Sequence, residues 1–229
     1  MKAVILAAGK GSRISTLVKD VPKPMILYEN KPILEHNIML CKTHGIEDIY
    51  INTSHLADLI TDYFRDGNKW GVKINYSFEP ELLGTAGALS NFKSQLKGNN
   101  FLVIYGDNFS SIDLSKLIAK HEKSKATITV ALHYREDVSQ SGVAEFLADG
   151  KITKFIEKPK TNQTQSHWVN AGIYVVSSKI FEYLPNGFSD FGIDIFPLLL
   201  QKNISLYCEC FNDNVLAFDS PEMYLKNKK

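Results

Sequence analysis

The sequence has few of the features that mark disulfide-bonded secreted proteins or zinc-binding proteins. It contains only three cysteines, Cys41, Cys208 and Cys210, and their odd number and wide spacing do not suggest a disulfide framework. Cys208 and Cys210 alternate along an expected strand, and the further ligands that a zinc site needs are not evident nearby. We therefore interpret the cysteines as small hydrophobic residues of a reduced protein.

Long hydrophobic runs and an excess of charge are also missing. The formal net charge is +1, so no overall field attracts nucleic acid or an anionic membrane. No stretch approaches the roughly 20 apolar residues of a membrane-spanning helix, and the first apolar run is too short for a signal peptide. We therefore expect a cytoplasmic protein with no nucleic-acid and no membrane partner. The sequence leaves open whether the protein forms a homodimer.

Strand and helix patterns alternate through the first half of the chain. Apolar and β-branched runs predict strands at Ala3–Ala7, Asp48–Thr53, Val72–Phe78 and Asn100–Tyr105, with helical segments between them. This order predicts an α/β fold with a Rossmann-like, mostly parallel, doubly wound sheet and right-handed crossovers.

The pattern changes in the second half, where strands predominate. A hairpin is expected for Gly142–Phe146 and Ile152–Glu157, followed by a strand at Val169–Val176. A length of 229 residues is within the range of one large α/β domain. We therefore expect a single domain over residues 1–229, with halves at 1–110 and 111–229 and a β-rich insertion in the second half.

A glycine-containing loop follows the first predicted strand. Leu6-Ala7-Ala8-Gly9 continues into Lys10-Gly11-Ser12-Arg13, and open α/β sheets bind ligands beyond the carboxyl ends of their strands. Glycines let backbone N–H groups point at an anion, and the guanidinium of Arg13 suits phosphate oxygens. The loop has neither the G-x-x-x-x-G-K-[ST] motif nor the G-x-G-x-x-G motif. On its own it indicates either an anion-binding loop or a simple strand-to-helix turn.

Ten residues after Arg13, two prolines flank a lysine in Val21-Pro22-Lys23-Pro24-Met25. The prolines are expected to hold Lys23 in an extended, stiff segment, from which its ammonium can be aimed at a polyphosphate. Taken with the loop, the pattern L-A-A-G-x-G-S-R … P-K-P resembles the signature of the sugar-phosphate nucleotidylyltransferases.

Further segments resemble this family in the same order along the chain. They are Leu83–Ala88, similar to the nucleotide-binding loop; Tyr105–Asn108, similar to the G-D segment that holds Mg²⁺; Ser141–Val143, with a glycine that faces the sugar; Phe155–Pro159, similar to F-x-E-K-P; and Val169–Tyr174, similar to the sugar-binding N-A-G strand.

The resemblance implies that a sugar 1-phosphate attacks the α-phosphorus of a nucleoside triphosphate and that pyrophosphate leaves. Such catalysis is mostly positioning and charge stabilisation. Arg13 and Lys23 would be catalytic, stabilising the α-phosphate and the departing pyrophosphate, and Lys158 would align the attacking phosphate. The other implied nucleotide-binding residues are Leu6, Ala7, Ala8, Gly9, Gly11, Ser12, Glu79, Gly84, Thr85 and Asp107, and those for the sugar phosphate are Gly142, Glu157, Lys158, Asn170 and Gly172.

Mg²⁺ is the implied cofactor, and it needs few protein ligands because phosphates and waters supply the rest. Asp107 is the expected first ligand, although an aspartate there can also cap the next helix. The second ligand departs from the family pattern, because alignment on Pro221-Glu222 places Ala217 where an aspartate is expected. Phe218-Asp219-Ser220 instead resembles cytidylyltransferases, so we take Asp219 as the second ligand, with a helix N-cap as its alternative role.

The base and the sugar are not settled by the resemblance. Leu83–Gly87 is similar to the mannose-1-phosphate and manno-heptose-1-phosphate guanylyltransferase branch, and Glu79 can accept from adjacent N–H donors of guanine. Ala8, where guanylyl enzymes have glycine, is more typical of uridylyl or cytidylyl relatives. We favour GTP with mannose or D-glycero-D-manno-heptose 1-phosphate and keep CTP and UTP open. A role for Glu79 as an ordinary surface carboxylate also stays open.

Three other function classes are weighed against this hypothesis. A cytidylyltransferase for a phosphocholine-like substrate fits Asp219-Ser220 but not the Asn170-Ala171-Gly172 strand. A non-catalytic nucleotide sensor predicts loss of Arg13, Lys23 or Asp107, and all three are present. A Rossmann dehydrogenase needs a third glycine in the first loop and an acidic residue at the end of the second strand, where Asn52-Thr53 stands.

Overall fold

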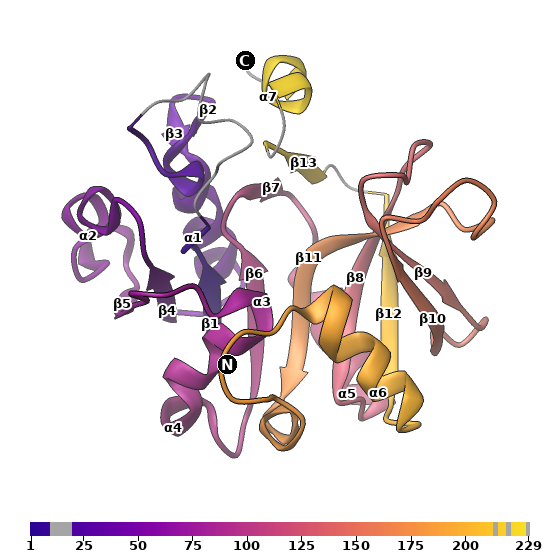
Figure 1. Ribbon diagram of the computed structural model, residues 1–229. Coiled ribbons are helices and arrows are strands. Elements are labelled where there is room, and N and C mark those ends of the chain that lie inside the picture. The colour runs from indigo at the N-terminus through magenta and orange to yellow at the C-terminus, as the bar shows by residue number, and fades with distance from the viewer. Residues whose placement is uncertain (10–19, 213–214, 219–220, 228–229) are drawn as a thin grey trace. The chain divides into compact units, whose positions relative to one another are not determined.

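The computed structural model describes residues 1–9, 20–212, 215–218 and 221–227, which fall into two compact units (Figure 1). The units interleave along the chain. The first comprises Met1–Leu82, Val103–Ser111 and Asn214–Lys229, and the second comprises Leu83–Leu102 and Ile112–Asp213. No helix among the described residues is both long and apolar enough to cross a membrane.

The first unit contains parallel strands whose carboxyl ends are aligned. Strands β1 (Lys2–Leu6), β4 (Asp48–Thr53) and β5 (Lys73–Phe78) follow β6 (Asn100–Tyr105) in the order β6-β1-β4-β5. Leu6 pairs with Asn52, and Asn52 pairs with Ser77, so β1, β4 and β5 end side by side. Ala3, Val4 and Ile5 are fully buried, as expected of a strand covered on both faces.

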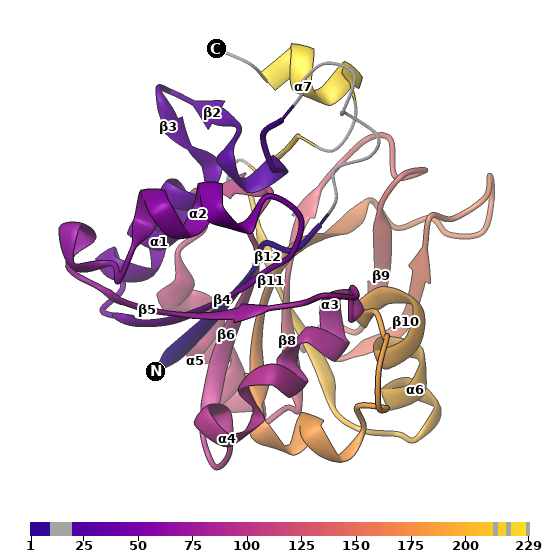
Figure 2. The same cartoon turned by 60° about the vertical axis from the view of Figure 1, so that its left-hand side comes forward.

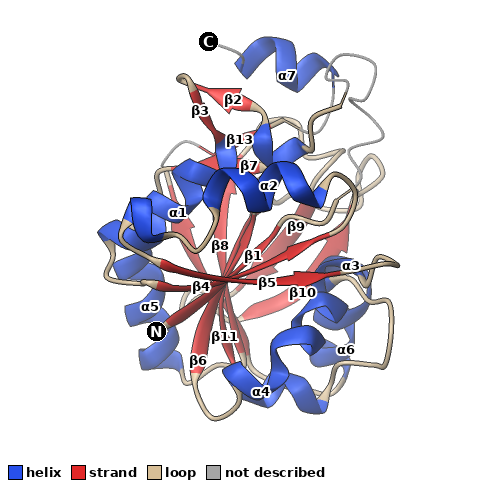
Figure 3. Ribbon diagram, turned by 90° about the vertical axis from the view of Figure 1, so that its left-hand side faces the viewer, coloured by secondary structure: helices blue, strands red, loops and turns tan. Residues whose placement is uncertain are grey.

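Helices of the first unit lie along these strands. Figure 2 and Figure 3 show α1 (Ile33–Thr43) and α2 (Ala57–Phe64) on the same side of β4 and β5. The remaining elements are the 3-10 turns η1 (Lys23–Met25) and η2 (Asn68–Trp70), the short strands β2 (Leu27–Tyr28), β3 (Lys31–Pro32), β7 (Asn108–Ser110) and β13 (Val215–Ala217), and the helix α7 (Pro221–Asn227).

An aromatic cluster fixes the segment after β6 in this unit. The ring of Tyr28 lies 4.7 Å from that of Phe109 and 5.8 Å from that of Phe218, which is fully buried. Because β13 pairs with β7, Ala217 stands opposite Asn108. The chain therefore returns from its C-terminal region to the residue that follows Asp107.

The second unit is built mainly from antiparallel strands, in the order β10-β9-β11-β6, with β8 pairing to β11 and β12. The pairing of β12 with β8 is parallel. These strands are β8 (Ile128–Tyr134), β9 (Gly142–Phe146), β10 (Ile152–Glu157), β11 (Trp168–Ser177) and β12 (Leu206–Phe211). The hairpin of β9 and β10 is confirmed, with Gly150 at φ 85° in its turn.

Helical segments complete the second unit. They are α3 (Gly84–Gly87), η3 (Ala88–Phe92), α4 (Lys93–Leu96), α5 (Leu114–Ser124), η4 (Ser178–Glu182), the π-helical turn η5 (Phe191–Ile195) and α6 (Phe196–Gln201). Together the described elements form a mixed, mostly parallel α/β fold with a β-rich second part, which confirms the predicted fold class.

Candidate active site

The predicted anion loop begins where β1 ends. Ala7 and Ala8 are buried, whereas Gly9 is exposed, and no described atom lies within 4 Å of the position that a Cβ would take there. Among the described residues, nothing blocks a close approach of a ligand to the Gly9 backbone, which a ligand-binding turn requires. Gly11, Ser12 and Arg13 lie outside the described residues.

A buried hydrogen-bond chain joins the ends of β1, β4 and β5. The Ala7 N–H donates to Asn52 Oδ1 at 2.8 Å, and Asn52 Nδ2 donates to Glu79 Oε1 at 2.9 Å. Asn52 is 3% exposed and Glu79 2% exposed. Of the two roles left open for Glu79, that of a surface carboxylate is wrong, because its side chain is buried and is linked to the glycine loop through Asn52.

Lys23 and Asp107 meet in the first unit. Lys23 Nζ lies 3.5 Å from Asp107 Oδ2, and the Lys23 side chain is 9% exposed against 30% for Asp107. The expectation that Lys23 stands in an extended segment is wrong: Pro22 is extended, but Lys23 opens the 3-10 turn η1, closed by the Met25 N–H on the Pro22 carbonyl. The fixed φ of Pro24 suits a first helical turn, which needs no N–H there.

Asp107 has the chemistry of a magnesium ligand, since its partly exposed carboxylate is the hard oxygen donor that Mg²⁺ prefers. Its alternative role as a helix cap is not observed: β7 follows it, and Asp113 caps α5 by accepting from the Ser115 N–H. The described residues include no cluster of three or more His, Cys, Asp or Glu that could hold a metal. Asp219 lies outside the described residues, so the fit rests on Asp107 with substrate phosphates and waters.

In the second unit, the glycine loop 84–87 packs against the segment 187–191. The Ser189 carbonyl accepts from the N–H groups of Ala86 and Gly87, and a Cβ on Gly84, which has φ 76°, would lie 2.4 Å from that oxygen. A Cβ on Gly87 would lie 2.4 Å from the Gly187 carbonyl oxygen. Both glycines are therefore required by the protein itself, whatever ligand the loop contacts.

Thr85 is fixed by a residue 105 positions away. Asp190 Oδ1 accepts from both the Thr85 N–H and the Thr85 hydroxyl, at 3.1 and 2.8 Å, and the Thr85 hydroxyl oxygen accepts from the Phe191 N–H. The residues from Gly84 to Leu96 form three short helical pieces, α3, η3 and α4, rather than one continuous helix.

Gly142 and Glu157 stand opposite each other in the hairpin of β9 and β10. A Cβ on Gly142 would lie 2.7 Å from Glu157 Oε2, and one on Gly192 would lie 2.8 Å from the same oxygen. Desolvation raises the pKa of the Glu157 carboxyl, and the negative charge of Asp190 adds to this rise, whereas the Lys158 ammonium opposes it. Gly142 and Glu157, predicted from separate motifs, therefore lie together, and the charge of Asp190 acts on the Glu157 carboxyl.

Asn170 and Gly172 form an irregular step in β11. Pairing with β8 shifts register between Asn170 and Tyr174, and Gly172 has φ 72°. Asn170 Oδ1 accepts from the Gly172 N–H, and Asn170 Nδ2 donates to the Tyr174 hydroxyl at 2.7 Å. The neighbouring residue Val169 pairs with Val143, so this step lies beside Gly142.

Lys158 begins the turn after β10. Its backbone has φ 47°, its N–H donates to the Ser141 carbonyl, and its side chain is exposed. The chain therefore leaves the direction of β10 directly after Glu157, the last residue of that strand. Glu157 and Lys158 therefore stand at the same end of the hairpin as Gly142.

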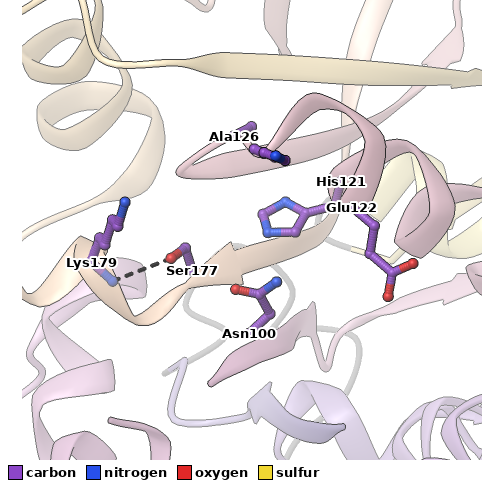
Figure 4. Close-up of a pocket in the computed structure, with 7 residues that line it drawn as sticks. Asn100, His121, Glu122, Ala126, Ser177 and Lys179 are labelled. Atoms are coloured by element: carbon purple, nitrogen blue, oxygen red, sulfur yellow. Dashed lines mark hydrogen bonds between the residues drawn. The ribbon is translucent and has the colours of Figure 1, made fainter. Parts of the chain in front are cut away.

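A separate cavity of about 340 Å³ lies elsewhere in the second unit (Figure 4). His121 lines it, with Nδ1 2.9 Å from the Thr129 hydroxyl oxygen, and burial lowers its pKa to about 4. None of the predicted site residues is among its lining, which is formed by Asn100, His121, Glu122, Lys125, Ala126, Ser177 and Lys179.

Sequence reasoning missed two residues that the structure links to the predicted site. Asn52 enters the sequence analysis only as a non-acidic residue at a strand end, and Asp190 is not among the predicted site residues. Neither lies in a short motif with its partner, because Glu79 is 27 positions from Asn52 and Thr85 is 105 positions from Asp190. Only the polar character of Asn52 at the end of an apolar strand could have indicated one of them.

Comparison with known proteins shows what the whole chain is similar to. A family model described as nucleotidyl transferase matches residues 2–216. A D-glycero-alpha-D-manno-heptose 1-phosphate guanylyltransferase from Campylobacter jejuni subsp. jejuni is 34% identical over 230 residues, covering 98% of this chain and 97% of that protein. A UTP--glucose-1-phosphate uridylyltransferase from Synechocystis sp. is 37% identical over 221 residues, covering 90% of this chain. The match covers 57% of the length of the Synechocystis protein.

Solved structures show the same fold. The crystal structure of HddC from Yersinia pseudotuberculosis superposes with a TM-score of 0.84 at 27% identity and covers 99% of this chain and 97% of that chain. A second crystal structure of HddC, in complex with GMP-PN, has a TM-score of 0.83 at the same identity.

Proposed function

The chain belongs to the nucleotidyl transferase family, and we propose that it joins a nucleoside triphosphate and a sugar 1-phosphate into a nucleoside-diphosphate sugar, with release of pyrophosphate. The observation that carries the proposal is the Lys23–Asp107 pair, at 3.5 Å, after β6. It combines a cation for phosphate oxygens with a carboxylate suited to Mg²⁺. The resemblance to sugar 1-phosphate enzymes supports the choice of acceptor.

The first unit would bind the nucleotide. Its supporting features are Gly9, whose Cβ position no described atom approaches within 4 Å, the buried Lys23 side chain with its ammonium beside Asp107, and the hydrogen-bond chain from Ala7 to Glu79. Arg13 would hold phosphate oxygens of the triphosphate with its planar guanidinium. Leu6, Ala8, Gly11 and Ser12 would contact the nucleotide through their backbones. Gly84 and Thr85, which belong to the second unit, are proposed as nucleotide-binding residues from the resemblance alone.

The chemical step would need charge stabilisation more than proton transfer. The attacking sugar phosphate oxygen is already anionic, so no general base is required. Lys23 and Arg13 would neutralise negative charge that builds on the α-phosphate and on the leaving pyrophosphate. When bound by Asp107 and Asp219, Mg²⁺ would supply further neutralisation at the α-phosphate. The pairing of Ala217 with Asn108 supports Asp219 as the partner of Asp107, because it brings the chain back to this segment.

The second unit would bind the sugar 1-phosphate. Glu157 and Asn170 offer hydrogen-bonding groups to sugar hydroxyls, and the exposed ammonium of Lys158 would align the phosphate. Gly142 leaves room for the Glu157 carboxylate, and Gly172 allows the irregular step that orients Asn170.

For the base and the sugar, we propose GTP with mannose or D-glycero-D-manno-heptose 1-phosphate. The C. jejuni relative is named as a heptose 1-phosphate guanylyltransferase and matches over nearly its whole length. UTP is the second candidate, favoured by Ala8 and by the Synechocystis relative, and CTP is the third. We also propose that the enzyme acts in the cytoplasm.

The test is a matrix of ATP, GTP, CTP, UTP and dTTP against mannose, manno-heptose and glucose 1-phosphates, each with Mg²⁺, read by pyrophosphate release. We expect release that depends on both substrates, with GTP the best nucleotide. Absence of release with every pair would refute the enzymatic proposal, whereas a preference for UTP or CTP would replace only the assignment of the base.

A further inference from the structure

Asn52 occupies a special place in the first unit, at the carboxyl end of β4 between the ends of β1 and β5. Figure 3 shows these three strands as neighbours. Open α/β sheets bind their ligands beyond this edge. Asn52 is nearly fully buried although its side chain is polar, so both ends of its amide need partners.

The two ends of the amide have different partners. The Ala7 N–H can only donate, so the atom of Asn52 that faces it at 2.8 Å must be the carbonyl oxygen. The amide nitrogen consequently faces Glu79, whose Oε1 accepts at 2.9 Å. The orientation of the amide is therefore fixed by chemistry, and Glu79 must present an acceptor to it.

Glu79 is also fixed at its backbone. Its N–H donates to the Thr53 carbonyl at 2.8 Å, and its carbonyl accepts from the Ser54 hydroxyl at 2.9 Å. Both bonds come from the residues that directly follow Asn52. The carboxylate and the peptide group of Glu79 are thus held by one short segment, Asn52–Ser54, which in turn holds the start of the glycine loop at Ala7.

We propose that Asn52 is a positioning residue for nucleotide binding: it sets the spacing between the Ala7–Gly9 backbone and the Glu79 carboxylate. This inference rests on the proposed function, since it assumes that the loop binds a nucleoside triphosphate. Asn52 itself need not touch the nucleotide. A buried polar network that is fully satisfied holds its members in one geometry, and loss of one member releases the others.

The structure offers a matched control for the experiment. Asn75 on β5 donates through Nδ2 to Asp48 Oδ1 on β4 at 3.1 Å, in a part-buried amide–carboxylate pair that resembles the buried pair of Asn52 and Glu79. Asn75 and Asp48 lie near the opposite ends of these strands. Asn75→Asp therefore places two carboxylates against each other as Asn52→Asp does, but away from the glycine loop.

The experiment compares steady-state kinetics of wild type, Asn52→Asp and Asn75→Asp with the best nucleotide and sugar 1-phosphate of the wild type. The aspartate that replaces Asn52 keeps an acceptor for the Ala7 N–H but repels Glu79. We expect the KM for the nucleotide to rise about tenfold or more in Asn52→Asp only. The KM for the sugar 1-phosphate should stay within about twofold in both variants, because the second unit holds its proposed ligands.

A rescue variant separates positioning from general damage. In the double variant Asn52→Asp/Glu79→Gln, the donor and the acceptor of this hydrogen bond exchange positions. The introduced glutamine can donate through Nε2 to the introduced aspartate, which still accepts from the Ala7 N–H. We expect the nucleotide KM of the double variant to fall below that of Asn52→Asp. If Asn52→Asp does not fold, Asn52→Ser takes its place, with the same expected rise in nucleotide KM and the same Asn75 control.

Two results would overturn the inference. One is a nucleotide KM in Asn52→Asp, or in Asn52→Ser, no higher than in Asn75→Asp. The other is a double variant no better than Asn52→Asp. Failure of the proposed function appears separately, as a wild-type protein without turnover for any pair of substrates.

Discussion

The Lys23 ammonium lies 3.5 Å from the Asp107 carboxylate, although the two residues are 84 positions apart in the sequence. The Lys23 side chain is the more buried of the two, and its backbone is fixed by the turn η1 and by Pro22 and Pro24 on either side of it. The pair therefore offers a preorganised cation beside a partly exposed carboxylate, which is the combination that phosphoryl chemistry uses.

Replacement of Lys23 should slow the reaction without unfolding the protein. We expect Lys23→Met, which keeps most of the apolar stem, to lower kcat by roughly a hundredfold or more, because a preorganised cation at the reacting phosphate is lost. The comparison is steady-state pyrophosphate release, with Lys69→Met on the surface turn η2 as the control. A kcat near that of wild type would show that Lys23 only shields Asp107.

Asp107→Asn should change the response to magnesium. The amide is a weaker and neutral ligand, so the Mg²⁺ concentration for half-maximal activity should rise by about tenfold or more. Titration of activity against Mg²⁺ measures this, and Asp113→Asn at the cap of α5 is the control. An unchanged titration curve would remove Asp107 from the proposed metal site.

Gly142→Ala should weaken the binding of the sugar 1-phosphate without affecting the binding of the nucleotide. Its methyl group would lie 2.7 Å from Glu157 Oε2 and 2.6 Å from the Phe155 ring, so the carboxylate must move. We expect the KM for the sugar 1-phosphate to rise by about tenfold, with the nucleotide KM unchanged. Leu147→Ala, at an exposed position in the turn of the same hairpin, is the control. Equal effects on both KM values would argue for a general distortion.

Asp190→Asn should shift the pH dependence of sugar binding. The Asp190 charge contributes to the raised pKa of Glu157, so its removal lowers that pKa. If Glu157 binds as a carboxylate, the KM for the sugar 1-phosphate rises at acid pH, and this limb should move to lower pH in the variant. A profile of KM against pH for wild type and Asp190→Asn measures the shift. A shift to higher pH would contradict the assignment.

Acid should destabilise the second unit through His121. Burial lowers its folded pKa to about 4, below the value of about 6.5 expected when unfolded, so the unfolded chain binds more protons between these values. The free energy of unfolding should therefore fall as pH decreases from about 6.5 to 4. His121→Gln should flatten this dependence in urea titrations, with buried His133, whose pKa is also lowered to about 4, accounting for part of what remains. A dependence as steep as in wild type would contradict this account.

The fold class and most strands could be predicted because apolar runs and turn residues are local signals. Residues 48–53 and 142–146, for example, form strands with the predicted bounds. The interleaving of two units could not be predicted, since it depends on β6 passing from one unit to the other. The 3-10 turn at Lys23 was missed because prolines favour both an extended segment and a first helical turn.

In the candidate site, too, local motifs could be predicted and long-range contacts could not. Gly142 and Glu157 were predicted from separate motifs, and the hairpin pairs them. The hydrogen bond between Thr85 and Asp190 could not be predicted, because residues 105 positions apart leave no local pattern in the sequence. The glycines at 84 and 87 were attributed to a ligand, whereas close packing against Ser189 and Gly187 already requires them.

The fate of the α-phosphate tests the central proposal most directly. With the best pair of substrates, the enzyme should transfer label from α-³²P nucleoside triphosphate into the sugar product and leave label from γ-³²P nucleoside triphosphate in pyrophosphate. Label from the γ-position in the sugar product, or no transfer from the α-position, would contradict the proposed nucleotidyl transfer to a sugar 1-phosphate.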